Sequence, residues 1–129
     1  MLDKGTAKGN YFESSAACMF VYALAKGVRN GYLPAKYLDV AKNGYRGILA
    51  EFVKTDINGQ LNLEGTVSVG GLGRNPYRDG SYEYYLSEKV VTNDPKGVGA
   101  LLLAATEMES HALADSSTSC AFLWAKRVS

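Results

Sequence analysis

The chain has 129 residues, a hydrophobic fraction of 47% and a net charge of +1. This length suits one domain, and the near-neutral charge without a long basic run excludes the electrostatic footprint of a nucleic-acid-binding protein. No apolar run reaches the roughly 18 residues of a membrane span, so we expect neither nucleic acid nor membrane as a partner.

The few cysteine and histidine residues limit the chemistry. Cys18 and Cys120 show neither metal-binding nor disulfide spacing, so we expect two free thiols in a reducing compartment. Residues 1–10 are polar and lack the apolar core of a secretory signal, and we expect a cytoplasmic location. A zinc site or a Ser-His-Asp triad would have to be built around the single histidine, His111, so we expect no metal and no cofactor.

Residues 11–30 are predicted to form a buried helix. Asn10 suits the N-cap, Glu13 follows it at the distance of a capping box, and Gly31 is the stop signal. Residues 16–25 are all apolar or aromatic, which leaves no side for water. We therefore expect this helix to be buried on all sides.

Residues 34–54 are predicted to form an amphipathic helix with one solvated face. Pro34 suits its first turn, and the short link "RNGYLP" favours an antiparallel hairpin with the preceding helix. The predicted apolar stripe consists of Leu38, Ala41, Tyr45, Ile48, Leu49 and Phe52.

A short β or irregular excursion is predicted over about residues 61–90. It follows a turn at Asn58-Gly59, a pair that favours positive φ. The run "LNLEGTVSV" alternates imperfectly, as a short strand or an extended arm does.

Residues 95–109 are predicted to form a third helix, capped by Asn93 or Asp94. Its segment 98–105 is again apolar on almost every side. The tail, residues 110–129, is expected to be partly disordered, with "CAFLW" as an aromatic anchor.

The order of buried, surface and buried helices is typical of an α/α toroid, in which inner and outer helices alternate; a plain helical bundle is the alternative. Two helices that are apolar on every face need more cover than one amphipathic helix provides. The chain therefore either self-associates, as a homo-oligomer through its exposed inner helices, or is a piece of something larger.

The segment 70–88, "GGLGRNPYRDGSYEYYLSE", combines glycines, tyrosines and charges. It lacks the spacing of a phosphate-binding loop. Two interpretations stay open. One is a structural cover over the helices; the other is a carbohydrate site in which tyrosine faces contact sugar rings while Arg78 and Asp79 bind hydroxyls or a uronate carboxylate.

Two helix starts carry further candidates. The "GNYFESS" cluster either caps the helix or aims hydrogen-bond donors at a ligand. Met19 either belongs to the core or, because it lies one turn below Ser15, lines the same ligand site. Asp94 and Lys96 form a cap and turn, or face the ligand if both inner helices open on one mouth. The candidate substrate-binding residues are Asn10, Tyr11, Glu13, Ser15, Met19, Arg78, Asp79, Tyr82, Asp94 and Lys96.

Three segments together resemble a known family: "GNYFESSAACMFVYALAKGVRNGYL", "VSVGGLG" and "PYRDGSYEYYLSEKVVTNDPKGVGALLLAATEME". Over roughly residues 8–109 they are similar to the C-terminal part of the unsaturated rhamnogalacturonyl hydrolases, glycoside hydrolase family 105, related to the family 88 unsaturated glucuronyl hydrolases. The resemblance implies an all-α fold, the C-terminal portion of a six-hairpin (α/α)6 barrel, with residues 1–109 as the partial barrel domain and 110–129 as a tail. It also implies a reaction on pectin-derived oligosaccharides, in which an aspartate acts as general acid and base to hydrate the C4=C5 enol ether of an unsaturated uronic acid.

The resemblance covers only the last third of such an enzyme. It places the catalytic aspartate outside this chain, so no catalytic residue is assigned, and the chain is expected to be inactive alone. Arg74 stands where the family usually has glycine. The alternatives are a carbohydrate-binding or structural helical module without catalysis, and an enzyme that uses its own carboxylates, Asp79 with Glu83 or Asp94.

Overall fold

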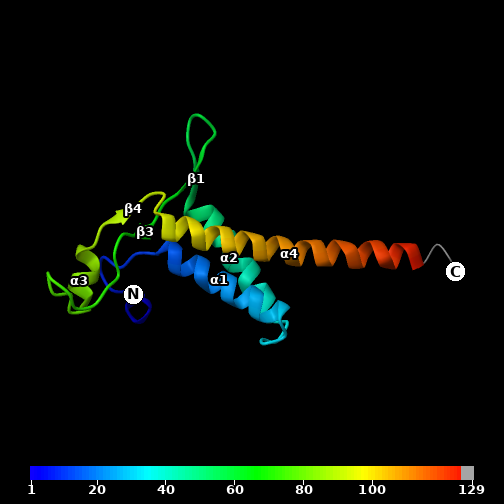
Figure 1. Cartoon of the computed structure of the whole chain (residues 1–129), viewed down its shortest axis with the longest axis horizontal. Helices are drawn as coiled ribbons and strands as arrows, with labels where there is room; N and C mark the ends of the chain where they lie inside the picture. The colour runs from blue at the N-terminus through cyan, green and yellow to red at the C-terminus, as the bar shows by residue number, and fades with distance from the viewer. Residues whose placement is uncertain (126–129) are drawn as a thin grey trace.

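The computed structural model describes residues 1–125, with side chains described for residues 1–114. The predicted "CAFLW" anchor and Cys120 lie outside the described side chains. Figure 1 shows a mostly helical molecule. Its elements are η1 (Leu2–Lys4), α1 (Ser14–Arg29), α2 (Tyr37–Glu51), β1 (Val53–Thr55), β2 (Leu61–Leu63), β3 (Thr66–Val67), α3 (Tyr82–Ser87), β4 (Val90–Val91) and α4 (Pro95–Ala125).

The helices α1 and α2 form the predicted antiparallel hairpin. Gly27 near the end of α1 lies against Leu33 in the link, and Gly44 in the middle of α2 lies against Val21. A Cβ atom at Gly44 would lie 2.9 Å from a Val21 methyl group. The glycine therefore allows the two helices to approach closely.

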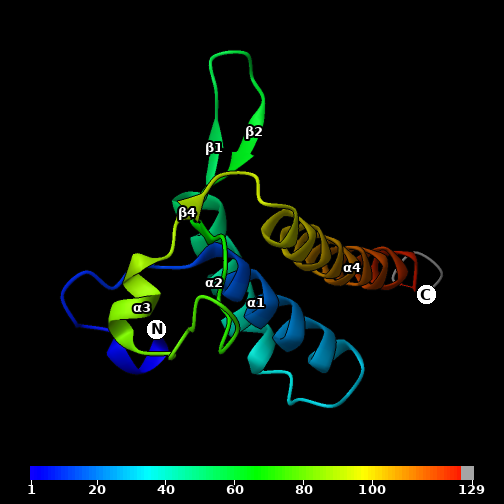
Figure 2. The same ribbon diagram turned by 60° about the vertical axis from the view of Figure 1, so that its left-hand side comes forward.

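The helices α1 and α4 lie side by side and run in the same direction (Figures 1 and 2). At their starts, Ser14 and Gly97 both lie against Thr66. Towards the other end, His111 Nε2 lies 2.9 Å from the carbonyl oxygen of Ala25. This parallel arrangement is the one predicted for two inner helices of a toroid.

The core forms where the three long helices meet. Burying a large apolar side chain there contributes roughly 1.5–3 kcal/mol. The buried cluster consists of Cys18, Val21, Ile48, Phe52, Leu63, Ala100 and Ala104.

The second helix was predicted over residues 34–54, and both predicted bounds are wrong, because α2 begins at Tyr37, after the predicted first turn at Pro34. α2 ends at Glu51, and the chain continues into the antiparallel β1–β2 hairpin, which pairs Val53 with Leu63 and projects away from the helices (Figure 1). The change occurs at Phe52, whose side chain is buried against Gly65. Because Phe52 continues the apolar spacing of α2, the sequence pattern alone does not reveal the helix end.

Two further elements differ from the predictions. α3 lies within the excursion and is capped by Ser81, whose hydroxyl accepts a hydrogen bond from Tyr84 N at 3.0 Å. α4 continues to Ala125, where a break and a partly disordered tail were expected. The division of the chain at residue 109 stays a prediction.

The predicted cap of α1 is also wrong. The N-cap is Glu13, whose carboxylate accepts hydrogen bonds from Ser15 N at 3.2 Å and Ala16 N at 2.7 Å. The same carboxylate accepts one from Val67 N at 3.1 Å. Asn10 instead accepts from the Met1 amino group and donates to the Met1 carbonyl oxygen. One glutamate therefore both caps α1 and holds β3.

The expectation that residues 16–25 and 98–105 are buried on all sides is wrong for this chain by itself. Met19 is 53% exposed and Leu102 is 62% exposed. α1 is covered by α2 and α4, and α4 by α1, so each helix keeps an apolar side in contact with solvent. Within the described part of the chain, no helix is both long and apolar enough to cross a lipid bilayer.

Replacing Gly65 with alanine is expected to destabilise the fold. Gly65 has a φ of +80°, and its new Cβ would lie 2.6 Å from Phe52 Cδ1. Gly59 has a φ of +81° with nothing within 4 Å, so Gly59→Ala is the matched control for backbone strain alone. Gly65→Ala should lower the free energy of unfolding, measured by urea titration, by about 1–3 kcal/mol more than the control does, because the added Cβ overpacks the core. Equal losses would contradict the packing role of Gly65.

Replacing Glu13 with alanine is expected to lower the free energy of unfolding by roughly 2 kcal/mol, since it removes a cap and leaves Val67 N without its partner. The exposed Glu64 provides the control, as Glu64→Ala, in the same urea titration. Hydrogen exchange at the Val67 amide should accelerate in the Glu13 variant alone. An unchanged exchange rate would show that Glu13 does not hold β3.

Candidate functional site

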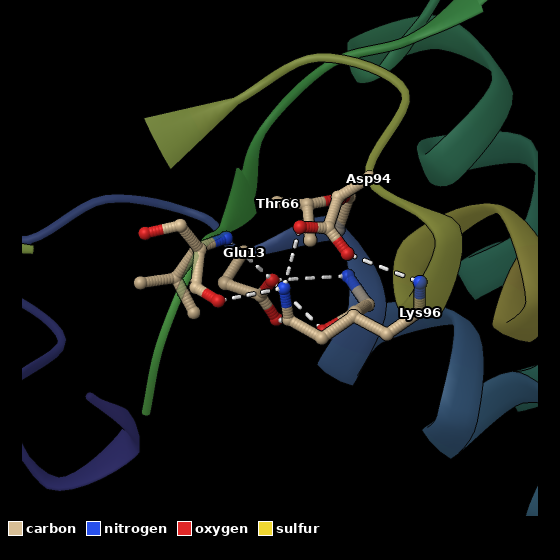
Figure 3. Close-up of polar contacts among 8 residues, drawn as sticks. Glu13, Thr66, Asp94 and Lys96 are labelled. Carbon is tan, nitrogen blue, oxygen red and sulfur yellow. Dashed lines mark hydrogen bonds and ion pairs between the residues drawn. The ribbon is translucent and has the colours of Figure 1, made fainter. Parts of the chain in front are cut away.

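The N-terminal ends of α1 and α4 lie close together, and residues 66–68 pass beside them (Figure 3). Glu13 at the start of α1 binds Val67 N. Lys96 in the first turn of α4 donates from Nζ to the Ser68 carbonyl oxygen at 3.0 Å. Both helix starts are therefore tied to the same extended segment.

Asp94 and Lys96 form a compact pair at the start of α4. The Asp94 carboxylate accepts a hydrogen bond from Lys96 N at 3.0 Å and lies 2.8 Å from Lys96 Nζ. The hydrogen bond from the Lys96 side chain holds the pKa of Asp94 below its usual value. Asp94 therefore stays ionised at neutral pH, and the cap-and-turn interpretation accounts for both residues.

Glu13 and Ser15 form a second pair at the start of α1. Ser15 Oγ donates to the two carboxylate oxygens of Glu13 at 2.9 and 3.0 Å. Ser15 is buried. These bonds hold the Glu13 carboxylate in the orientation that caps the helix.

The candidates Asn10 and Tyr82 hold the N-terminal segment in place. Asn10 Nδ2 donates to the Lys4 carbonyl oxygen at 3.0 Å. Tyr82 Oη donates to the carbonyl oxygens of Lys8 and Ala7 at 3.1 and 3.3 Å. The segment before α1 is thereby attached to α3.

Tyr11 stacks on Tyr85 of α3, with ring centroids 5.0 Å apart and an angle of 7° between the planes. Among the described residues, the buried Tyr11 hydroxyl has no hydrogen-bond partner. Burial raises the pKa of Tyr11 above its usual value, so this hydroxyl stays protonated.

Arg78 and Asp79 lie on the 70–88 segment, beyond the helix starts (Figure 1). Arg78 Nε lies 3.7 Å from a Glu88 carboxylate oxygen. Asp79 is exposed and accepts a hydrogen bond from Ser81 N at 2.9 Å, which lowers the pKa of Asp79. The Arg78 side chain is 24% exposed and that of Lys96 at the start of α4 is 42% exposed, so Arg78 is the more enclosed of these two cations.

A groove of about 520 Å³ opens beside the start of α1. Its walls include Phe12, Phe20, Val67 and Tyr85, which the sequence prediction did not select. The spacing of Ala16 and Phe20 along one face of α1 was the signal that could have found it. Met19 is exposed, so its assignment to the core is wrong, and it does not line the groove.

The chemistry at this end of the molecule favours binding over proton transfer. A general acid needs a pKa near the working pH, whereas the pKa values of Asp79 and Asp94 are both lowered by hydrogen bonds. Among the described residues, no three His, Cys, Asp or Glu side chains form a group able to hold a metal ion.

Comparison with known proteins relates this fold to sugar-cleaving enzymes. Protein Atu3128 of Agrobacterium fabrum and the 24.9 kDa protein in picA locus of Rhizobium radiobacter are each 42% identical to this chain over 113 residues. These matches cover 83% of this chain and 48% of each relative. The chain thus spans about half the length of the curated relatives that it matches.

Solved structures show the same relationship. A glycoside hydrolase from family 105 of C. acetobutylicum is 49% identical, with a TM-score of 0.83, over 85% of this chain and 31% of that chain. A possible family 105 member from Salmonella enterica is 25% identical, with a TM-score of 0.63, over 82% of this chain and 25% of that chain. The fold is a portion of the helical barrel of these proteins.

The family model described as Glycosyl Hydrolase Family 88 matches residues 1–112, which is most of the sequence. The mostly helical architecture agrees with the resemblance found in the sequence. The chain belongs to glycosyl hydrolase family 88.

Proposed function

We propose that this chain forms part of a glycoside hydrolase that removes unsaturated galacturonyl or glucuronyl residues from pectin-derived rhamnogalacturonan oligosaccharides. The reaction is hydration of the C4=C5 enol ether. The observation that carries the proposal is the match to the family 105 glycoside hydrolase of C. acetobutylicum, with 49% identity and a TM-score of 0.83. Family membership over residues 1–112 supports the reaction class.

The contribution of this chain is to shape the sugar-binding end of the barrel. The starts of α1 and α4 lie at one end, and the 70–88 segment extends beyond them (Figure 1). Arg78 is partly exposed and carries the positive charge that a uronate carboxylate requires. Asp79 and Tyr82 lie on the same segment and supply an acceptor and an aromatic face.

The chain by itself does not supply the catalytic acid. A hydrogen bond from Arg29 lowers the pKa of Glu107, as hydrogen bonds lower those of Asp79 and Asp94. All three therefore hold a proton less readily than an ordinary carboxyl, which is the opposite of what an acid at neutral pH needs. The chain also covers only 31% of the length of the solved relative.

A carbohydrate-binding or structural helical module without catalysis is the second candidate. The groove beside α1 favours it, because the groove walls are mostly apolar and the nearby polar groups of Asn10 and Glu13 are engaged within the chain. In either case we place the protein in the cytoplasm, in keeping with the buried free thiol of Cys18.

Neither this chain nor its Asp79→Asn variant is expected to hydrolyse an unsaturated galacturonyl-rhamnose disaccharide. The assay follows the loss of ultraviolet absorbance as the C4=C5 double bond is hydrated. Turnover by the parent chain that Asp79→Asn or Asp94→Asn removes would contradict the proposal and assign catalysis to these carboxylates.

The sugar-binding role is tested in a chimera. Residues 1–112 replace the matching segment of the C. acetobutylicum relative, and the chimera is expected to keep the activity of that relative on the disaccharide. Within the chimera, Arg78→Ala should raise KM about tenfold with little change in kcat, since it removes one charge-assisted hydrogen bond to the uronate.

The matched control is Arg46→Ala, at an exposed arginine on the α2 surface. Its KM should equal that of the chimera. If the chimera is active and Arg78→Ala leaves its KM unchanged, the contact between Arg78 and the uronate is refuted. A relative that does not hydrolyse the disaccharide at all would refute the proposed substrate.

A further inference from the structure

Three asparagines of this chain are followed directly by glycine: Asn30, Asn43 and Asn58. Asparagine is a thermally labile residue. The backbone nitrogen of the next residue attacks the side-chain carbonyl carbon, ammonia leaves, and water opens the resulting succinimide ring to aspartate or isoaspartate. Glycine favours the attack, because it has no side chain to shield its nitrogen and its backbone adopts many conformations. The fold then decides which of the three pairs can react.

Asn43 lies in the interior of α2, where the fold suppresses the reaction. The nitrogen of Gly44 belongs to the helix, in which each N–H donates to the carbonyl oxygen one turn earlier. The Asn43 side chain accepts a hydrogen bond from Arg46 Nη1 at 2.8 Å, and Gly44 packs against Val21 of α1. This part of α2 must therefore unfold and separate from α1 before the nitrogen can attack.

Asn30 lies at the C-cap of α1, where the backbone is also held. Asn30 N donates to the Lys26 carbonyl oxygen at 2.9 Å, and Gly31 N donates to the Val28 carbonyl oxygen at 3.0 Å. The next two backbone nitrogens both donate to the Gly27 carbonyl oxygen, at 2.8 and 3.0 Å. Although the pair is exposed, the end of α1 has to open before its nitrogen is free.

Asn58 lies in the turn of the β1–β2 hairpin, which projects away from the helices (Figures 1 and 2). Its side chain is exposed and, among the described residues, makes no hydrogen bond. A Cβ atom at Gly59 would have no heavy atom within 4 Å, and the preceding Ile57 is 99% exposed. Packing against the rest of the molecule therefore does not hinder the attack at this turn.

The hydrogen bonds that restrain Gly59 are local to the turn. Gly59 N donates to the Asp56 carbonyl oxygen at 3.0 Å, and the Asp56 carboxylate accepts bonds of 2.9 Å from Asn58 N and Gln60 N. The hairpin has three residue pairs, and a two-stranded hairpin is only marginally stable by itself. Its tip can therefore open while the buried Leu63 at its base stays in the core.

We propose that Asn58 is the site at which this folded protein deamidates. Gly59 N forms a bond to Asn58 Cγ, the bond between Cγ and the amide nitrogen breaks, and ammonia leaves with the proton of Gly59 N. Water then opens the succinimide, and the product carries a new carboxylate. The formal net charge falls by one from +1. In the isoaspartate product the backbone is also longer, which disrupts the turn that Asp56 holds.

The first test is incubation of the folded full chain in mildly alkaline buffer at physiological temperature. Acidic digestion and peptide mass spectrometry then measure how much of each asparagine has become acid. Asn58 is expected to convert about tenfold faster than Asn30 or Asn43, because opening the turn requires less free energy than opening either helix. Conversion of Asn30 or Asn43 as fast as Asn58, or an Asn58 that stays an amide throughout, would overturn the proposal.

The same incubation in guanidinium chloride separates the effect of the fold from that of the local sequence. In the unfolded chain the three pairs lose the contacts that distinguish them, so their rates should become similar. If Asn58 keeps its full preference in guanidinium chloride, the local sequence selects the site, and the structural argument is wrong.

The third test follows charge on the intact protein, and it does not depend on the proposed function. The parent chain should yield an acidic species in ion-exchange chromatography, whereas Asn58→Gln should not, because glutamine would have to close a larger ring and does so far more slowly. Asn43→Gln, at the protected pair, is the matched control and should yield the acidic species at the parent rate. Far-UV circular dichroism verifies that both variants are folded. An acidic species that forms in Asn58→Gln at the parent rate would contradict the assignment to Asn58.

Discussion

The parallel contact between α1 and α4 determines where the helix starts and the 70–88 segment lie. The contact is close because the facing positions are small: Cys18 and Ala25 on α1, and Ala100 and Ala104 on α4, are all buried. Larger side chains would separate the helices and open a gap in the core. Since the helices run in the same direction, both starts lie at one end of the molecule, and the 70–88 segment that joins β3 to the start of α4 must lie at that end too.

A clamp at the helix starts secures this arrangement. Thr66 shares a 2.7 Å hydrogen bond with Ser14 and packs against Gly97, where a Cβ atom would collide with its hydroxyl. Glu13 adds its bonds to Val67, and Arg29 pairs with the buried Glu107 further along the helices. Burying a carboxylate is costly unless a cation pairs with it, so this ion pair also favours one register of α1 on α4. These contacts therefore fix the relative positions of the helix starts that form the candidate site.

The sequence predicted two helix ends from local signals. Gly31, the predicted stop signal after α1, has a φ of +74°, and Asp94, a predicted cap of α4, accepts a hydrogen bond from Lys96 N at 3.0 Å. The cap of α1 was assigned to Asn10 instead of Glu13, although the bonds of Glu13 to Ser15 N and Ala16 N are local. The bond from Val67 N to Glu13 was missed because it joins residues that only the folded chain brings together. The length of α4 was missed for a different reason: a Ser/Thr-rich stretch resembles a break in the sequence, whereas serine and threonine side chains can donate to carbonyl oxygens one turn earlier within a helix, as Thr106 and Ser110 do earlier in α4.

The contrast between local signals and contacts that form only on folding also applies to the candidate site. Residue types located the polar candidates, yet most of these polar groups are engaged inside the chain, as with Asn10 on Met1 and Tyr82 on Lys8. Side chains engaged in this way hold the surface in shape. On the 70–88 segment, too, Arg78 lies beside Glu88 and Asp79 accepts a hydrogen bond from Ser81. Residue types therefore indicate which groups are polar, but not which of them the fold uses for its own contacts. The apolar sides of α1 and α4, which the pattern marked as buried, are in contact with solvent in this chain, because the pattern shows how many apolar faces a helix has but not which segment covers each of them.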